Sequence, residues 1–186
     1  MHLPNISARP LTGAVAVACV AALATAAVFA ATTFRAAPAG AAAAASMPSC
    51  TTSGLAIRLD TQGNGAAGSI FYNLEFTNIS RHTCTLSGYP RVFAVNLGGA
   101  QIGRAASRNS SPRPRVVTLA RSGTAIVILQ IVEVGNFPGA ICRPVTAAGL
   151  RVYPPNQTAS KVIPFRLGAC SDTGPVYLSV QAVQKA

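Results

Sequence analysis

The sequence predicts an all-β domain of two packed antiparallel sheets, and three observations support this prediction. Apolar and polar residues alternate along several short segments after position 50, which is the period of a half-buried strand. The repeat of an amphipathic helix is not evident beyond residue 45. Clusters of Gly, Pro, Asn and Ser separate the segments, as expected of turns. We therefore expect one domain at residues 46–186.

The first 45 residues differ in composition from the rest and predict a signal for export. Between Arg9 and Arg35 lie 25 residues without a charged side chain. Small residues with several Ala-x-Ala strings follow, so we expect cleavage after about Ala45. The uncharged run exceeds the roughly 20 residues that span a membrane, which leaves a retained N-terminal anchor as an alternative. Lipidation at Cys19 is a third alternative, although too little apolar segment precedes that cysteine.

Three segments in the first half of the domain have the pattern of strands. Apolar residues alternate with polar ones in residues 55–59 and again in residues 70–76, so each segment has one apolar face. A third segment runs from Arg91 to Leu97 and ends at Gly98-Gly99, a hairpin signal that leads into Gln101-Ile102.

The second half of the domain contains the most apolar segment, at residues 124–132. Because apolar side chains lie on both of its sides, we expect a central strand that is covered on both faces. Shorter strands are expected at residues 150–153, 162–167 and 176–182. Pro164 lies inside the second of these and predicts an edge strand, since proline cannot donate a hydrogen bond to a neighbouring strand.

Four cysteines follow position 45, and they are Cys50, Cys84, Cys142 and Cys170. An even number in a chain expected to reach an oxidising compartment indicates two disulfides. Spacing alone does not choose among the three possible pairings. Each successive pair of cysteines brackets two expected strands of one hairpin, so we predict the bonds Cys50–Cys84 and Cys142–Cys170. Each closes a loop of roughly 30 residues and stabilises the fold by about 3 kcal/mol. A metal site is not expected, because no two cysteines lie close together.

Side chains suited to catalysis are scarce after position 45. The segment holds one histidine, His82, and four separate acids, which are Asp60, Glu75, Glu133 and Asp172. Acid–base or nucleophilic catalysis needs a base held against its partner, and none of these acids is paired in sequence. We therefore expect a protein that is not an enzyme and uses no cofactor, with His82 solvated in a polar turn. A hydrolase assembled from distant strands remains a minor alternative.

The most unusual segment carries five arginines and no acid. They are Arg104, Arg108, Arg113, Arg115 and Arg121. Thirteen basic residues and four acids follow position 45, so the net charge of the domain is +9. Clustered guanidinium groups suit an anionic polymer, an acidic lipid surface or an acidic protein. The alternative is a solvated connection without a ligand. Nucleic acid is not an expected partner, because export separates the chain from it and the segment lacks aromatics that stack on bases.

Three strings stand out beside the cysteines. They are Phe76-Thr77-Asn78-Ile79-Ser80, Cys84-Thr85-Leu86-Ser87-Gly88-Tyr89-Pro90 and Leu150-Arg151-Val152-Tyr153-Pro154-Pro155. These signature strings resemble an actinobacterial exported or lipid-anchored domain family of unknown function, over about 135 residues from Cys50. The resemblance implies an immunoglobulin-like sandwich and supplies no activity. This chain departs from the family at Arg121-Ser122, where Pro-Gly is usual, so we expect a locally altered turn.

The signature strings have a structural explanation, and we assign them no binding role. Asn78 and Ser80 suit a turn, and Gly88 suits a positive φ. The leading functional hypothesis is a non-enzymatic secreted or envelope-associated binding module whose contact surface is residues 104–121. The second hypothesis is a structural module that pairs with a protein partner through a sheet face or strand edge. Either module contacts the membrane through its N-terminal segment only if that segment is uncleaved.

Overall fold

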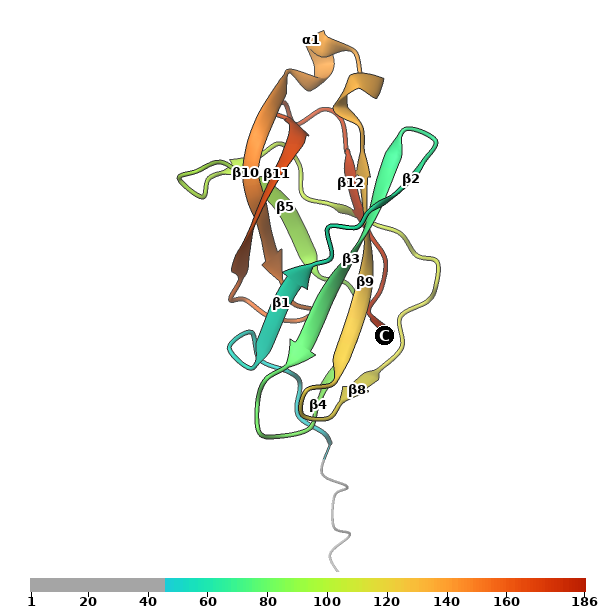
Figure 1. The fold of residues 1–186 in the computed structure, drawn as a ribbon, viewed down its shortest axis with the longest axis vertical. Helices are drawn as coiled ribbons and strands as arrows, with labels where there is room; N and C mark the ends of the chain where they lie inside the picture. The colour runs from blue at the N-terminus through green and yellow to red at the C-terminus, as the bar shows by residue number, and fades with distance from the viewer. Residues whose placement is uncertain (1–45) are drawn as a thin grey trace, which may run out of the picture. The chain divides into compact units, whose positions relative to one another are not determined.

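The computed structural model describes residues 46–186, and these residues are mostly β-strand (Figure 1). The expected signal segment and Cys19 lie outside the described residues. Within residues 46–186, no helix has the length and apolarity needed to cross a membrane. Two short helices, η1 (Val134–Asn136) and α1 (Gly139–Cys142), join two of the longest strands.

The described strands form three sheets. The seven-stranded sheet contains β1 (Leu55–Leu59), β2 (Asn64–Ala66), β3 (Ser69–Asn78), β7 (Ser107–Arg108), β9 (Thr124–Val132), β12 (Leu178–Val180) and β13 (Gln184–Lys185). The four-stranded sheet has the order β11 (Lys161–Cys170), β10 (Pro144–Tyr153), β5 (Arg91–Val95) and β6 (Gln101–Ile102). The third sheet pairs β4 (Cys84–Leu86) with β8 (Val117–Leu119).

Every expected segment contains a strand, but the strands expected at residues 91–97 and 176–182 are shorter, at Arg91–Val95 and Leu178–Val180. The short strands β2, β4 and β13 were not predicted. β10 and β11 are each ten residues long and so extend beyond the segments predicted for them. Two strands, β7 and β8, lie within the basic segment that we expected to be a loop. β7 also pairs with β12 in parallel, so the sheets are not purely antiparallel. These short strands were missed because their pairing comes from distant segments and not from a pattern of their own.

β9 is central, as predicted, but only one of its faces is fully buried. It pairs with β3 along its whole length and with β12 and β13 on its other side. Its inward row is buried and consists of Ala125, Val127, Leu129 and Ile131. The opposite row, which includes Ile126 and Ile128, is only partly covered. The prediction of full coverage on both faces is therefore wrong, because apolar composition does not show what packs over a face.

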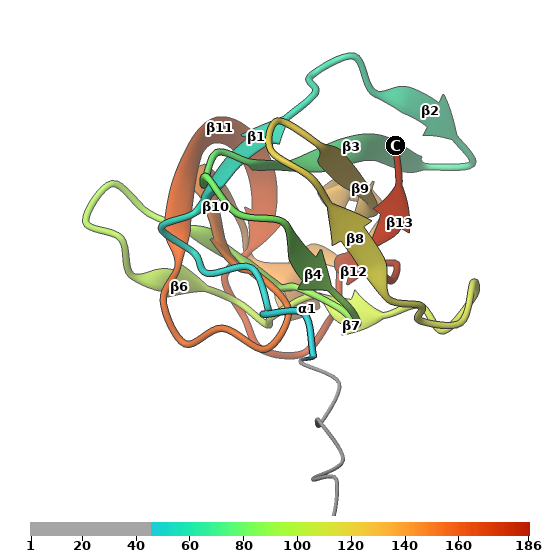
Figure 2. The ribbon, with the colours of Figure 1, turned by 90° about the horizontal axis from the view of Figure 1, so that it is seen from below.

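One apolar core joins the two large sheets. Leu74 and Phe76 of β3 are fully buried in the same cluster as Val92 of β5 and Leu150 and Val152 of β10. Figures 1 and 2 show β10 and β11 on one side of the domain and β3 and β9 on the other. The alternation seen in the sequence therefore places one row of each sheet in a shared interior.

Pro164 lies on the edge strand β11, as predicted from its missing amide hydrogen. It is opposite Gly149, where the register of β10 shifts by a bulge. A Cβ atom on Gly149 would lie 2.5 Å from the carbonyl oxygen of Ile163, so this close approach requires glycine. Beside the same edge, Lys161 Nζ donates a hydrogen bond to the carbonyl oxygen of Leu55 in β1.

Both predicted disulfides are present, and each closes one end of a hairpin. Cys50–Cys84 joins the segment before β1 to β4, and Cys142–Cys170 joins α1 to the end of β11. Their sequence separations are 34 and 28 residues. Neither bond links the seven-stranded sheet to the four-stranded sheet, so the contact between those sheets depends on the apolar core.

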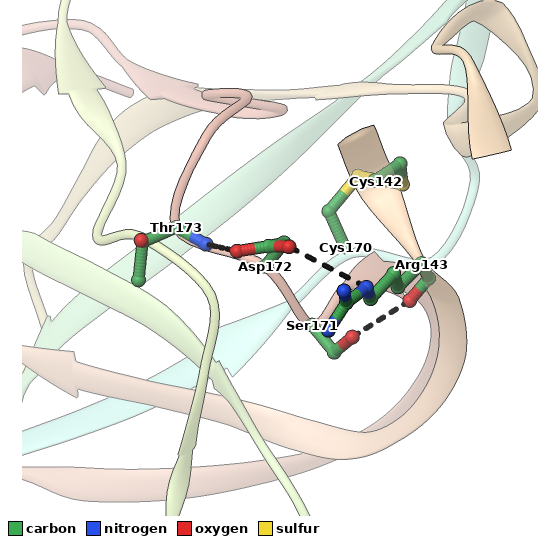
Figure 3. A network of polar contacts seen from close by, with 6 residues as sticks. All are labelled: Cys142, Arg143, Cys170, Ser171, Asp172 and Thr173. Atoms are coloured by element: carbon green, nitrogen blue, oxygen red, sulfur yellow. Dashed lines mark hydrogen bonds and ion pairs between the residues drawn. A yellow bond between two sulfur atoms is a disulfide. The ribbon is translucent and has the colours of Figure 1, made fainter. Parts of the chain in front are cut away.

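Polar contacts surround the second disulfide (Figure 3). The Ser171 hydroxyl donates to the carbonyl oxygen of Arg143 over 2.8 Å, and the Arg143 guanidinium lies 3.6 Å from the Asp172 carboxylate. Asp172 in turn accepts a hydrogen bond from the backbone N–H of Thr173. The ion pair is well exposed, so it contributes at most about 1 kcal/mol and the covalent bond dominates here.

Asn78 is the last residue of β3, and its side chain connects the turn after β3 to the turn after β8. Its amide nitrogen donates to the carbonyl oxygens of His82, Leu119 and Ala120, over 2.8, 2.9 and 3.3 Å. Its amide oxygen accepts hydrogen bonds from the backbone N–H and the hydroxyl of Ser80. Asn78 is completely buried, so these partners replace water for both ends of the amide.

We expect Asn78→Ala to lower the free energy of unfolding by about 3 kcal/mol, because it removes a buried donor to the Leu119 carbonyl and donors to two partly buried carbonyls, at about 1–3 kcal/mol for each unsatisfied buried group. Urea unfolding followed by circular dichroism measures this change. The control is Asn64→Ala in β2, where the side chain is exposed and a change within about 0.5 kcal/mol is expected. Equal stability of the two variants would contradict the role of Asn78.

The chain forms a tight turn at Arg121-Ser122, and its difference from the turn usual in the family stays a prediction. The backbone N–H of Gly123 donates to the carbonyl oxygen of Ala120 over 2.9 Å, which closes a four-residue turn. Ser122, the third residue of this turn, has a φ of 62°. A positive φ at the third position is typical of a type II turn, which favours Pro and then Gly at its centre. Serine therefore holds a left-handed position of this turn, which glycine would adopt without strain.

We expect Ser122→Gly to raise the free energy of unfolding by about 0.5–1 kcal/mol. The substitution relieves a left-handed conformation that disfavours a non-glycine residue by about 1–2 kcal/mol, and the added chain entropy offsets part of this gain. Ser110→Gly is the matched control, because Ser110 is exposed and lacks a positive φ, and it should destabilise slightly. Urea unfolding followed by circular dichroism tests both variants. A lower free energy of unfolding for Ser122→Gly would show that the left-handed backbone of Ser122 is not strained.

Candidate functional site

The five arginines of the basic segment are all exposed, and the structure does not gather them into one cluster. Arg104 follows β6, and Arg121 lies in the turn between β8 and β9. Arg108 belongs to β7 and lines one cleft, whereas Arg113 and Arg115 line another. Arginines of the segment therefore line two separate clefts. The reason is that β7 pairs within the seven-stranded sheet, whereas β8 pairs with β4 in another sheet.

Arg113 and Arg115 line what we call the basic cleft, which has a volume of about 760 Å³. Its lining comprises Pro112, Arg113, Arg115, Val116, Val117, Thr118, Val183, Gln184 and Lys185. Val117 and Val183 are buried, so the cleft has an apolar part beside three cationic side chains. Lys185 was not predicted from the sequence, because only the fold brings the C-terminal strand beside residues 112–118.

Regular pairing positions the walls of the basic cleft. Lys185 and Gln184 of β13 lie opposite Ala125 and Ile126 of β9. Val117 and Thr118 of β8 lie opposite Leu86 and Thr85 of β4. Both walls are therefore attached to strands of the fold, although residues 112–116 themselves are outside any strand.

No carboxylate balances the cations of the basic cleft. Its lining contains Arg113, Arg115 and Lys185 but no acid. Across residues 46–186, the one ion pair joins Arg143 to Asp172. The side chains that line the cleft therefore carry only positive charge, which attracts anions and is weakened by salt.

A second cleft of about 450 Å³, which we call the tyrosine cleft, lies where two signature strings meet. Its lining comprises Gly88, Tyr89, Arg91, Arg108, Tyr153, Pro154, Asn156, Gln157 and Thr158. Neither Tyr89 nor Tyr153 was predicted from the sequence to bind a ligand. Only the fold brings residues 88–91 beside residues 153–158, and no pattern in the sequence indicates this contact.

The candidate catalytic side chains lie apart from both clefts. His82 is exposed in the turn after β3 and lines neither cleft. Among the acids, Glu75 lies opposite Arg58 on β1, and Asp172 contacts Arg143. In the described part of the chain, no group of three His, Cys, Asp or Glu side chains is placed to hold a metal ion. The arrangement of both clefts suits binding of an anion, and the absence of enzymatic activity stays a prediction.

Two tyrosines have shifted pKa values for opposite reasons. Burial raises the pKa of Tyr177 to about 12, and its hydroxyl has no hydrogen-bond partner in the core. The polar side chains of Ser160 and then Arg151, with a smaller effect of Arg91, lower the pKa of Tyr153. Tyr153 therefore lies in surroundings that favour negative charge, whereas Tyr177 is a core residue.

Comparison with protein families finds one match. The family model described as a domain of unknown function (DUF4232) matches residues 50–184, which includes every strand except the last residue of β13. Searches of curated proteins and of solved structures found no match.

Proposed function

The chain belongs to the DUF4232 family of domains of unknown function, and from this premise we propose that it is an exported, non-enzymatic module that binds an anionic polymer of the cell envelope. The basic cleft is the proposed contact surface. The observation that carries the proposal is the grouping of Arg113, Arg115 and Lys185 around one cleft without a carboxylate. Such a site favours a partner with repeated negative charges, because each cation then meets its own anionic group.

Export is supported by the cysteines and by the N-terminal sequence. All four cysteines of the domain form disulfides, which persist in oxidising compartments and are rare in the cytosol. The uncharged run between Arg9 and Arg35, followed by small residues, has the composition of a cleaved signal. We therefore propose that the mature protein begins near residue 46 and acts outside the membrane, as in the actinobacterial exported proteins that it resembles.

We also propose that the fold is a variant of the immunoglobulin-like sandwich. Two large sheets with one shared core support this relation. The disulfides differ from those of antibody domains, where one bond links the two sheets. Here both bonds hold hairpin ends, and a parallel pair, β7 with β12, extends one sheet.

Pairing with a protein partner through a strand edge is less well supported. Pro164 interrupts the long edge strand β11, and the Lys161 side chain reaches from that edge to Leu55 of β1. The opposite edge of the same sheet is β6, which is only two residues long. Proline, lysine and short edges are features that oppose pairing with another chain.

The triple variant Arg113→Gln, Arg115→Gln and Lys185→Gln is expected to bind soluble polyphosphate about 100-fold more weakly at about 0.1 M salt. Each cation near an anionic surface contributes about 1 kcal/mol, and 1.4 kcal/mol is tenfold in affinity. Titration calorimetry with polyphosphate and with polyglutamate measures the loss of affinity for these two anionic polymers. A third titration, with vesicles of anionic lipid, shows whether the protein binds lipid as well as polymer.

The matched control changes three arginines that line neither cleft, with Arg81→Gln, Arg104→Gln and Arg121→Gln. Both triple variants lose the same net charge, so an equal loss of binding would show that charge alone matters and would overturn the proposal. Retention of polymer binding by the control and its loss in the cleft variant support a specific site.

If the protein is exported and its signal is cleaved, the mass of the mature protein is fixed by the cleavage site and the two disulfides. Protein isolated from the medium or envelope is expected to match residues from about 46 onward, because the signal has been removed. Its mass should rise by about four hydrogens on reduction, since two disulfides take up two hydrogens each. Intact mass spectrometry before and after reduction makes both measurements. Recovery of the full chain from the cytosol with all five of its cysteines as free thiols would contradict export.

A further inference from the structure

The tyrosine cleft has a feature that the basic cleft lacks, which is that each of its cations is held over an aromatic ring. The Arg91 guanidinium carbon lies 4.0 Å from the centre of the Tyr153 ring. The Arg108 guanidinium carbon lies 5.5 Å from the centre of the Tyr89 ring. A guanidinium stacked on a ring keeps its N–H donors at its edges, where they can bind an oxyanion with two hydrogen bonds.

Strand pairing places both cations. Arg91 of β5 lies directly opposite Tyr153 of β10, so the pair forms across two hydrogen-bonded strands. Arg108 lies opposite Val180, where β7 pairs with β12. The two guanidinium groups thus come from different sheets and line the same cleft without a carboxylate in its lining. Exposed arginine side chains are usually mobile. Contact with a tyrosine ring limits this motion, so less side-chain entropy is lost when a ligand binds.

A turn places side-chain oxygens on the same cleft. The backbone N–H of Gln157 donates to the carbonyl oxygen of Pro154 over 3.1 Å, with Pro155 and Asn156 at the centre of the turn. Asn156 has a φ of 59°, which asparagine tolerates well and which fits the third position of a type II turn. The double proline of the third signature string therefore presents Asn156, Gln157 and Thr158 to the cleft.

The amide nitrogens of this turn already have partners. Asn156 Nδ2 donates to the carbonyl oxygen of Ser87, and Gln157 Nε2 donates to the carbonyl oxygen of Asn156, each over 3.3 Å. Each nitrogen keeps a second N–H, and the amide oxygens of both residues can accept a hydrogen bond from a ligand. The cleft lining therefore combines cationic donors with neutral amide groups that can bind hydroxyl groups.

We propose that the tyrosine cleft binds a hydroxylated oxyanion, namely the phosphate- or carboxylate-bearing sugar unit of an acidic saccharide. Arg91 and Arg108 bind the phosphate or carboxylate, and the amide oxygens of Asn156 and Gln157 accept hydrogen bonds from hydroxyl groups. A volume of about 450 Å³ lies within the range of small-molecule sites, roughly 300–1,000 Å³, and fits one such unit. This inference does not rest on the basic cleft, since the two clefts share no lining residue.

The surroundings of Tyr153 support a site for negative charge. Ser160 and Arg151, and to a smaller degree Arg91, lower the pKa of its hydroxyl. A bound oxyanion beside Arg91 meets the same positive surroundings. The contact of Arg91 with the Tyr153 ring also predicts that replacement of either side chain weakens binding, although Tyr153 itself does not contact the anion.

The test is NMR titration of the disulfide-intact domain with glucose 6-phosphate, glucuronate and glucose. We expect saturable shifts of residues 88–91 and 153–158 with the two acidic sugars and none with glucose, because only the first two supply an oxyanion. Inorganic phosphate should bind more weakly than glucose 6-phosphate, since it has no sugar hydroxyl groups. Arg91→Gln and Arg108→Gln should each reduce affinity at least tenfold, as each removes one charged donor pair.

Two controls keep the outcome decisive. The double variant Arg104→Gln and Arg121→Gln removes as much charge as Arg91→Gln and Arg108→Gln combined, and it should bind glucose 6-phosphate as the unchanged protein does. The basic-cleft variant of Arg113, Arg115 and Lys185 should also retain sugar binding, so failure of polymer binding and failure of this inference are separate results. Each spectrum also reports whether the variant is folded.

Three results would overturn the inference. They are the absence of saturable binding by either acidic sugar, equal binding of glucose, and unchanged affinity in a folded variant that lacks both Arg91 and Arg108. Shifts confined to residues 112–118 and 183–185 would likewise reject the tyrosine cleft, because they would place the anion in the basic cleft.

Discussion

The inward rows of β3, β9, β5 and β10 meet in one buried cluster, and the positions of both clefts depend on this contact. The disulfides hold hairpin ends and do not join the two large sheets. The sheets therefore stay together through apolar packing, at about 25 cal/mol for each Å² buried. Every loop that lines a cleft begins or ends at a strand that contributes to this core. The packing of the core therefore positions these loops.

Buried polar groups then fix the loops that the core leaves free. The Asn78 amide binds the carbonyl oxygens of Leu119 and Ala120, which places the end of β8 and thereby one wall of the basic cleft. On the other side, the backbone N–H of Val183 donates to the carbonyl oxygen of Gly88 over 2.9 Å. Because Val183 lines the basic cleft and Gly88 lines the tyrosine cleft, one backbone contact connects the two sites.

The excess of basic residues is arranged in two different ways. In the basic cleft, Arg113, Arg115 and Lys185 lie beside apolar side chains and have no acidic partner. In the tyrosine cleft, Arg91 and Arg108 stack on aromatic rings that hold them in place. The first arrangement suits an extended polyanion bound by charge, and the second suits a smaller ligand recognised by the direction of its hydrogen bonds. A domain with few acids can thus carry two kinds of anion site on one scaffold.

The sequence by itself determined the strand segments, the edge position of Pro164 and the pairing of the four cysteines, because alternation, proline chemistry and hairpin closure are local constraints. It also indicated the turn at Asn78 and Ser80 and the positive φ of Gly88, which are local, but not the hydrogen bonds of Asn78 to Leu119 and Ala120. It did not reveal the short strands of the basic segment, the open outer face of β9 or the left-handed Ser122. Only the tertiary structure decided which cations share a cleft, because Lys185 joins Arg113, and Arg91 joins Arg108, through pairing between strands far apart in the chain.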